Sequence, residues 1–290
     1  MYKRQADYDT RVLTLAEVNR PALQLAGFYN YFDPKRLQII GRVESTYLEL
    51  KTEAERRQSF EQLMKYDISA LVLCHGAAAF PECLEMAEKY DCNVFTTSED
   101  TSDFMANVIS SLHTHLAPRT TVHGVLVEVH GEGVLLTGDS GIGKSETALE
   151  LIKRGHRLIA DDSVIIKNIN DQLIGKSPEK IRYYMEIRGI GIINIQRMFG
   201  PGAVRPDKGV DIIAELSQWE QGKTYDRIGI NEQYDEVLGI NVQKVVIPVT
   251  PGRNIPIVLE TAARKFRLKQ EGYDPASDLM QSVFGSADGD

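Results

Sequence analysis

The chain has 290 residues, of which 42% are hydrophobic and 26% charged, as in an ordinary globular protein. This balance excludes wholesale disorder, because enough apolar surface is present to form a sizeable core. The formal net charge of −8 argues against a protein that coats nucleic acid, which usually has a basic face. At about 150 residues per domain, the length predicts two domains.

Neither a targeting signal nor a membrane span is predicted. The N-terminus is polar and lacks the apolar segment of a secretory signal. No apolar run approaches the roughly 20 residues that a membrane span requires. Cys74, Cys83 and Cys92 lack the spacing of a zinc site or a disulfide framework. We therefore expect free thiols and a cytoplasmic protein without membrane or nucleic-acid partners.

Predicted strands and helices alternate in the first part of the chain. The strands are expected at residues 37–41, 70–74 and 93–97, and the helices at 48–66, 81–90 and 102–115. Such alternation predicts a small N-terminal α/β domain with a short parallel sheet. Because proline ends helices, Pro118 marks a boundary between domains 1–117 and 118–290. No motif in the first domain carries chemistry.

The second domain begins with a β-rich stretch at 122–129, a turn at 131–133 and a strand at 134–137. The elements expected after these are a phosphate-binding loop at 138–145, a helix at 146–154, strands at 157–160, 164–166 and 245–247, and a helix at 256–270. The tail from about Asp274 is polar, and we expect it to fray. This order is typical of an α/β domain built around a phosphate-binding loop.

The strongest motif matches G-x-x-x-x-G-K-[ST] in full. It consists of Gly138, Asp139, Ser140, Gly141, Ile142, Gly143, Lys144 and Ser145. The glycines let backbone N–H groups turn toward phosphate oxygens, and the following helix adds a favourable dipole. Lys144 is expected to reach the β- and γ-phosphates of a nucleotide, and Ser145 to ligate Mg²⁺. The sequence lacks the Asn-Lys-x-Asp motif that reads guanine, so nothing indicates a GTPase.

Two carboxylates, Asp161 and Asp162, follow an apolar strand, where P-loop proteins place a second Mg²⁺ ligand. Successive strand residues face opposite ways, so the two are expected to do different work. We interpret Asp161 as the carboxylate on the metal side and Asp162 as the one that reaches the reacting oxygen. The alternative is a solvated Asp-Asp turn.

His123 is a weaker candidate. If Gly131-Glu132 is a two-residue hairpin turn, His130 lies opposite Gly133 and, by extrapolation, His123 lies opposite Ser140. That register predicts an imidazole beside the phosphate loop. On spacing alone, a satisfied core histidine is the more common outcome.

Two further segments place glycine and arginine together, as turns that hold anions do: 186–194 and 248–253. Each is weak alone, because a glycine-containing turn into a strand explains the first about as well.

Taken together, these segments resemble the HPr kinase/phosphorylase family. The resemblance rests on Thr121 to Gly124, the phosphate loop with its helix to Leu151, Arg154 to Asp162, Glu186 to Asn194, Tyr225 to Gly229, and Pro248 to Arg253. Asn19 to Gly27 extends it, less diagnostically, into the N-terminal domain.

The resemblance implies a P-loop kinase-type α/β C-terminal domain. It also implies a bifunctional enzyme that phosphorylates one serine of the phosphocarrier protein HPr with ATP or pyrophosphate. It also implies removal of that phosphate with inorganic phosphate, a role in carbon catabolite repression, and a homohexamer. By position, the active residues would be His123, Lys144, Asp162 and Arg227, and the Mg²⁺ ligands Ser145 and Glu186. Segments 185–194 and 248–253 would support catalysis, the second mainly in dephosphorylation, through Arg188, Gly189, Gly191, Asn194, Pro248, Pro251, Gly252 and Arg253.

Two alternatives stay open on the sequence. One is a P-loop kinase that phosphorylates a small metabolite, and the other is a switch that binds ATP without transferring its phosphate. Asp162 argues against the switch, since a serine hydroxyl needs a base within hydrogen-bond reach before it attacks.

Overall fold

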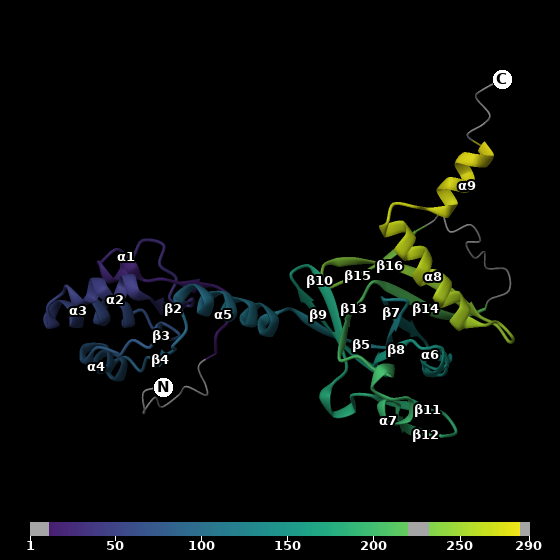
Figure 1. The fold of residues 1–290 in the computed structure, drawn as a ribbon, viewed down its shortest axis with the longest axis horizontal. Helices are drawn as coiled ribbons and strands as arrows, with labels where there is room; N and C mark the ends of the chain where they lie inside the picture. The colour runs from purple at the N-terminus through teal and green to yellow at the C-terminus, as the bar shows by residue number, and fades with distance from the viewer. Residues whose placement is uncertain (1–11, 220–231, 285–290) are drawn as a thin grey trace. The chain divides into compact units, whose positions relative to one another are not determined.

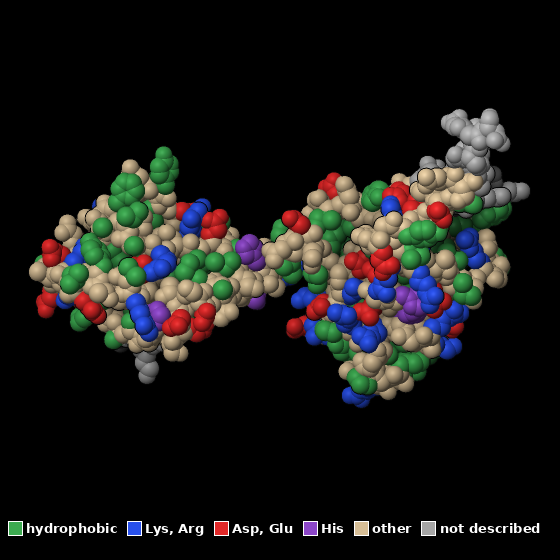
Figure 2. Space-filling model, turned by 45° about the horizontal axis from the view of Figure 1, so that its top comes forward, with side chains coloured by type: hydrophobic (Ala, Val, Ile, Leu, Met, Phe, Trp, Pro, Cys, Tyr) green, Lys and Arg blue, Asp and Glu red, His purple; other side chains and the backbone are tan. Residues whose placement is uncertain are grey.

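A computed structural model describes residues 12–219 and 232–284 of the chain (Figure 1). The chain divides into two compact units, Met1–Ala117 and Pro118–Asp290. Acidic and basic side chains are interspersed on the visible face of both units (Figure 2). Within the described residues, no helix is long and apolar enough to cross a membrane.

The N-terminal unit contains the predicted parallel sheet, in the order β1-β2-β3-β4. Its elements are β1 (Val18–Asn19), α1 (Ala22–Leu25), β2 (Leu37–Ile40), α2 (Arg42–Glu49), α3 (Glu53–Met64), β3 (Leu71–Leu73), α4 (Pro81–Lys89), β4 (Val94–Thr96) and α5 (Thr101–Leu116). Alternate strand residues face two apolar cores. One face packs against α3 and α4, and the other against α5. The prediction of a small parallel α/β domain is confirmed.

One predicted helix is wrong, because residues 48–66 form parts of two helices. The chain leaves α2 after Glu49 and re-enters a helix at Glu53. Thr52 begins the second helix by accepting a hydrogen bond from the Glu55 backbone N–H, while the Glu55 carboxylate accepts one from the Thr52 N–H at 2.8 Å. This reciprocal capping box interrupts a pattern that otherwise favours one helix. As expected, all three cysteines are free, and they are buried.

The C-terminal unit is built on a six-stranded sheet of order β15-β16-β14-β7-β6-β8 and a four-stranded sheet of order β13-β10-β9-β5. Its strands are β5 (Arg119–His123), β6 (Val125–Val129), β7 (Glu132–Gly138), β8 (Arg157–Ala160), β9 (Ser163–Ile169), β10 (Gln172–Lys176), β11 (Tyr184–Ile187), β12 (Gly191–Asn194), β13 (Asp207–Gly209), β14 (Ile212–Gln218), β15 (Gln233–Val237) and β16 (Ile240–Val249). Its helices are α6 (Lys144–Lys153), α7 (Ile195–Phe199), α8 (Ile255–Gln270) and α9 (Pro275–Phe284), with 3-10 turns at Glu179–Ile181 and Pro201–Ala203.

The large sheet lies between two layers. Helices α6 and α8 pack on one face, and strands β9 and β10 of the smaller sheet pack on the other. Strands β11 and β12 form a separate antiparallel hairpin beside α7, at one end of the unit (Figure 1). The tail does not simply fray as predicted, because α9 forms after Asp274, whose carboxylate accepts hydrogen bonds from the Ala276 N–H and the Ser277 hydroxyl.

The β-rich stretch at 122–129 is two strands rather than one. The β-structure is interrupted at Gly124, where a Cβ would lie 2.6 Å from the Leu136 carbonyl oxygen. Strand β5 before the break joins the smaller sheet, and β6 after it joins the larger sheet. The predicted hairpin register is also wrong, because Val129 pairs with Glu132 and the turn consists of His130 and Gly131. His123 is therefore not placed by the β6–β7 hairpin.

Candidate active site

The phosphate loop joins β7 to α6, as its motif predicts. Lys144 is buried, and its Nζ donates hydrogen bonds to the carbonyl oxygens of Gly138 (2.8 Å) and Asp139 (2.9 Å). The loop bends through Gly141, which has a φ of +84°. A Cβ at this position would also lie 2.4 Å from Nη1 of Arg188. The positive φ favours glycine here, and a larger side chain would also displace the Arg188 guanidinium.

Asp161 reaches the same edge of the sheet from β8. Strands β7 and β8 both pair antiparallel with β6, so they run in the same direction and their carboxyl ends lie together. The Ser145 hydroxyl donates to Asp161 Oδ1 at 2.9 Å, and the Glu186 backbone N–H donates to Oδ2 at 3.1 Å. Burial raises the pKa of Asp161, and these two hydrogen bonds oppose the rise. The carboxylate is thus held on the inner side of the site.

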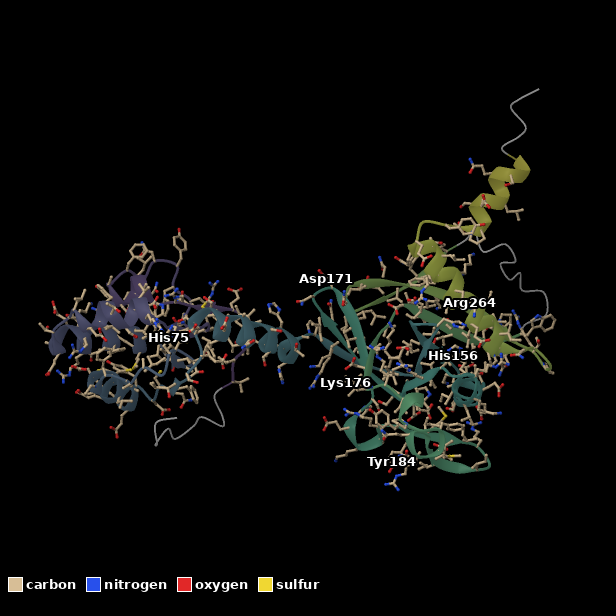
Figure 3. All side chains as sticks on the ribbon, viewed as in Figure 1. His75, His156, Asp171, Lys176, Tyr184 and Arg264 are labelled. Atoms are coloured by element: carbon tan, nitrogen blue, oxygen red, sulfur yellow. The ribbon has the colours of Figure 1, made fainter. Side chains whose placement is uncertain are left out.

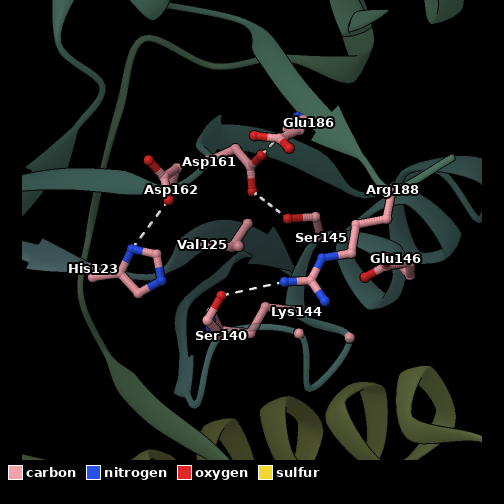
Figure 4. A pocket seen from close by; sticks show the side chains of 12 residues that line it. His123, Val125, Ser140, Lys144, Ser145, Glu146, Asp161, Asp162, Glu186 and Arg188 are labelled. Carbon is pink, nitrogen blue, oxygen red and sulfur yellow. Dashed lines mark hydrogen bonds and ion pairs between the residues drawn. The ribbon is translucent and has the colours of Figure 1, made fainter. Parts of the chain in front are cut away.

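Asp162 points the other way and is largely exposed. It has a φ of +64°, and the Ser163 N–H donates to the Asp161 carbonyl at 2.7 Å across it, as in a three-residue turn. Aspartate tolerates this left-handed backbone better than most residues. The turn directs the carboxylate to His123, whose Nδ1 lies 3.1 Å from Asp162 Oδ1 (Figure 4).

The position of His123 follows from the smaller sheet. Strands β5 and β9 are antiparallel, and His123 pairs with Ser163, the residue after Asp162. The Gly124 N–H also donates to the Asp162 carbonyl at 3.2 Å. His123 therefore lies at the site, as predicted, but through its pairing with β9 rather than opposite Ser140.

The β11–β12 hairpin closes another side of the site. Arg188, just after β11, crosses to the phosphate loop, where its Nη2 lies 3.3 Å from Ser140 Oγ (Figure 4). Glu186 donates its backbone N–H to Asp161 and also lines the pocket. Gly189 lies in the turn between the strands and Gly191 begins β12, and both have positive φ.

Together these elements line a pocket of about 150 Å³ that is open to solvent. Its lining residues are His123, Val125, Ser140, Gly141, Gly143, Lys144, Ser145, Glu146, Asp161, Asp162, Glu186 and Arg188. Two cationic side chains and four carboxylates surround this space. Such a set suits an anion held at the cations together with a divalent cation at the oxygen ligands.

Two lining residues were not predicted from the sequence. Val125 follows the break at Gly124, and Glu146 lies in the first turn of α6 directly after Ser145. The position of Glu146 next to the motif is the signal that would have identified it. Val125 carried no such signal, because its place depends on the break between the two sheets.

Other predicted residues lie outside the pocket. Asn194 caps α7, where its Oδ1 accepts a hydrogen bond from the Arg197 N–H at 2.9 Å. Among the described residues, Pro248, Pro251, Gly252 and Arg253 do not line the pocket, and Arg253 Nη1 donates to the Pro248 carbonyl at 3.2 Å. Strand β16 is parallel to β14, which is parallel to β7, so this segment leaves the sheet at the same edge as the phosphate loop. Arg227 lies outside the described residues.

Two family models match the chain. The HPr Serine kinase N terminus matches residues 1–112, and the HPr Serine kinase C-terminal domain matches residues 114–283. Curated relatives named HPr kinase/phosphorylase include one from Caldicellulosiruptor bescii, 48% identical over 267 residues, which are 92% of this chain and 86% of the relative. Another, from Peptoclostridium acidaminophilum, is 47% identical over 269 residues, which are 92% of this chain and 87% of the relative.

A solved structure is also similar. The Hpr(Ser) kinase/phosphatase from Coxiella burnetii is 40% identical, with a TM-score of 0.51. The match covers 55% of this chain and 98% of that one.

Proposed function

The chain belongs to the HPr Serine kinase family, whose curated members are enzymes with kinase and phosphorylase activity, and on that premise we propose the reaction of its site. It transfers a phosphoryl group from ATP, or from pyrophosphate, to a serine of the protein HPr. In the reverse direction, inorganic phosphate removes that group and pyrophosphate is formed. Through this balance the enzyme takes part in carbon catabolite repression, in the cytoplasm and as a homohexamer.

The observation that carries the proposal is the meeting of the phosphate loop, Asp161 and Asp162 in one pocket. Lys144 uses two of its three N–H donors on loop carbonyls, which leaves the third for a phosphate oxygen. Arg188 brings a second cation to the loop at Ser140. Phosphoryl transfer depends mostly on such positioning and charge neutralisation.

The pocket also fits Mg²⁺, because its oxygen donors are those that this hard cation prefers. Ser145, Asp161 and Glu186 would hold the ion, and Asp161 already accepts hydrogen bonds from the Ser145 hydroxyl and the Glu186 backbone N–H. When bound, Mg²⁺ would offset the negative charge on the phosphate oxygens.

Asp162 is the group that we assign to proton transfer. As the serine oxygen bonds to phosphorus and the bond to the donor phosphate breaks, the exposed carboxylate accepts the serine proton. In reverse, an oxygen of inorganic phosphate bonds to phosphorus, and Asp162 returns the proton to the leaving serine oxygen. His123, 3.1 Å from Asp162, orients the carboxylate. Arg227 assists from the segment outside the described residues.

The test is to mix the protein with HPr, ATP and Mg²⁺ and to analyse HPr by mass spectrometry. We expect the mass of HPr to increase by one phosphoryl group, located on a serine. ATP consumption that needs a small metabolite and leaves HPr unchanged would indicate a small-molecule kinase. Nucleotide binding without transfer to either acceptor would indicate a switch.

A further inference from the structure

The β11–β12 hairpin has one buried face and one exposed face. Met185 and Ile187 point into the apolar core with α6 and are 1% and 5% exposed. Tyr184 and Glu186 alternate with them and are exposed, as expected for a strand with one solvated side. Since Glu186 lines the phosphate pocket, the exposed face of the hairpin continues the rim of that pocket.

This exposed face carries apolar side chains where polar ones would be ordinary. Ile192 pairs directly with Glu186 across the hairpin, so both lie on the same face. Ile192 is 74% exposed, and Ile190, in the turn that also carries Arg188, is 73% exposed. Tyr184, the first residue of β11, is 47% exposed, and its position is labelled in Figure 3. We call these three residues the hairpin face.

A single exposed apolar residue needs no explanation, but a group of them beside a reaction site does. The core is already complete beneath this hairpin through Met185 and Ile187, so packing does not require isoleucine at 190 or 192. The free energy falls when a partner covers apolar surface of this kind and removes it from water. A serine on a folded protein can reach the pocket only if the surface around that serine approaches its rim.

We propose that the hairpin face is the docking surface for the protein that carries the acceptor serine, and that apolar side chains beside that serine cover Ile190 and Ile192. This inference rests on the proposed function, with HPr as the protein substrate. The hairpin would then perform two tasks, because Glu186 and Arg188 line the phosphate pocket while Ile190 and Ile192 select the acceptor.

The experiment measures steady-state kinetics of HPr phosphorylation for the full chain and for Ile192→Ser. We expect the KM for HPr to rise about tenfold, the scale typical of an important interface residue. The KM for ATP and the kcat are expected to change less than about twofold, since only binding of the acceptor is affected. Ile192→Val keeps the apolar surface and is expected to restore the wild-type KM for HPr.

Ile257→Ser is the matched control, because Ile257 lies on α8 and is 49% exposed but does not belong to the hairpin. It is expected to leave the KM for HPr unchanged. An unchanged KM for HPr in Ile192→Ser would overturn the docking proposal. So would a changed oligomeric state by light scattering without a change in this KM, since the face would then contact a second copy. A wild-type enzyme that never phosphorylates HPr would instead contradict the proposed function itself.

Discussion

In the N-terminal unit, Arg20 follows β1 and donates two hydrogen bonds, at 3.0 and 2.9 Å, to the buried carboxylate of Glu44. The same carboxylate accepts the Gly41 N–H at 2.9 Å, and Thr101 Oγ1 lies 2.9 Å from His75 Nε2 nearby. In the C-terminal unit, the polar groups at the corresponding edge of the sheet surround an open pocket. Both units thus gather polar side chains at the carboxyl ends of aligned strands.

The difference lies in which groups satisfy the polar atoms. Around Glu44 the partners come from the protein itself, and a Cβ at Gly41 would lie 2.5 Å from Thr101 Oγ1, so the space is filled. Lys144 and Arg188 instead line an open pocket, where Lys144 keeps one N–H donor beyond its two bonds to loop carbonyls. We propose that the first cluster stabilises its unit and that the second performs chemistry, and each assignment makes a separate prediction.

The largest effect is expected for Lys144→Ala, which should lower the rates of both phosphorylation and dephosphorylation by at least about a thousandfold. Both directions need the same cation at the phosphate loop. Phosphoryl transfer to and from HPr would be measured on one preparation. Lys153→Ala is the control, since Lys153 lies on the same helix and is exposed. Near-normal activity of Lys144→Ala with intact nucleotide binding would remove the assignment.

The next effect is expected for Asp162→Asn, which should reduce the kinase rate by about 10²–10⁴-fold while ATP still binds. Asparagine keeps the shape and tolerates the left-handed backbone at this position, but it accepts no proton. Rates and nucleotide affinity would be compared with those of Asp161→Asn. We expect Asp161→Asn to lower the affinity for Mg²⁺ instead. If it abolished the chemistry and Asp162→Asn were nearly silent, the two roles would be reversed.

Glu44→Gln tests the closed cluster and is expected to lower the free energy of unfolding of the N-terminal unit by about 1–3 kcal/mol. The kcat should stay unchanged. Hydrogen exchange of β2 and β3 amides in the full chain would measure the loss. Glu61→Gln, which breaks the exposed pair with Lys89, should lower the stability distinctly less, because water screens an exposed ion pair. An equal loss in both variants would contradict a special role for the Glu44 cluster.

The stability that Glu44 contributes is predicted to depend on pH. Burial acts to raise the pKa of Glu44, but hydrogen bonds from Arg20 and Gly41 outweigh it, so the pKa lies below its usual value. A depressed carboxyl pKa contributes stability above the unfolded pKa of about 4.3, and this stability is lost as pH falls through the folded value. The difference between the wild type and Glu44→Gln should therefore shrink below about pH 4.

The smallest effect is expected for Arg253→Ala, which tests how far the open site extends beyond its lining residues. Arg253 leaves the sheet at the edge of the phosphate loop and could orient incoming phosphate. Dephosphorylation is expected to fall about tenfold, as for loss of one charge-assisted contact, and phosphorylation less. The two rates would be measured alongside those of Arg267→Ala, whose arginine pairs with Glu132. Equal losses in both directions would exclude the special role in reverse.

The features that could be predicted from the sequence are those that depend on residues close together in the chain. The phosphate loop, its lysine and the carboxylates after β8 are local patterns, and the structure places Lys144, Ser145, Asp161 and Asp162 in one pocket. The capping box at Thr52 was equally local and could have divided the first predicted helix. His123 differs, because its position depends on pairing between β5 and β9, some 40 residues apart. The register of β5 could not be extrapolated from the β6–β7 hairpin, because β5 and β6 separate at Gly124 and join different sheets.

We propose that one open pocket carries out phosphoryl transfer in both directions. A site that holds the β- and γ-phosphates of ATP can hold pyrophosphate in the same place, with inorganic phosphate as the attacker on phosphoserine. The direct test incubates serine-phosphorylated HPr with the enzyme, with and without inorganic phosphate, and identifies the product by ³¹P NMR. We predict dephosphorylation only when phosphate is present, with pyrophosphate as the product. Rapid dephosphorylation in phosphate-free buffer that yields only orthophosphate would mean hydrolysis and would contradict the proposed phosphorolysis.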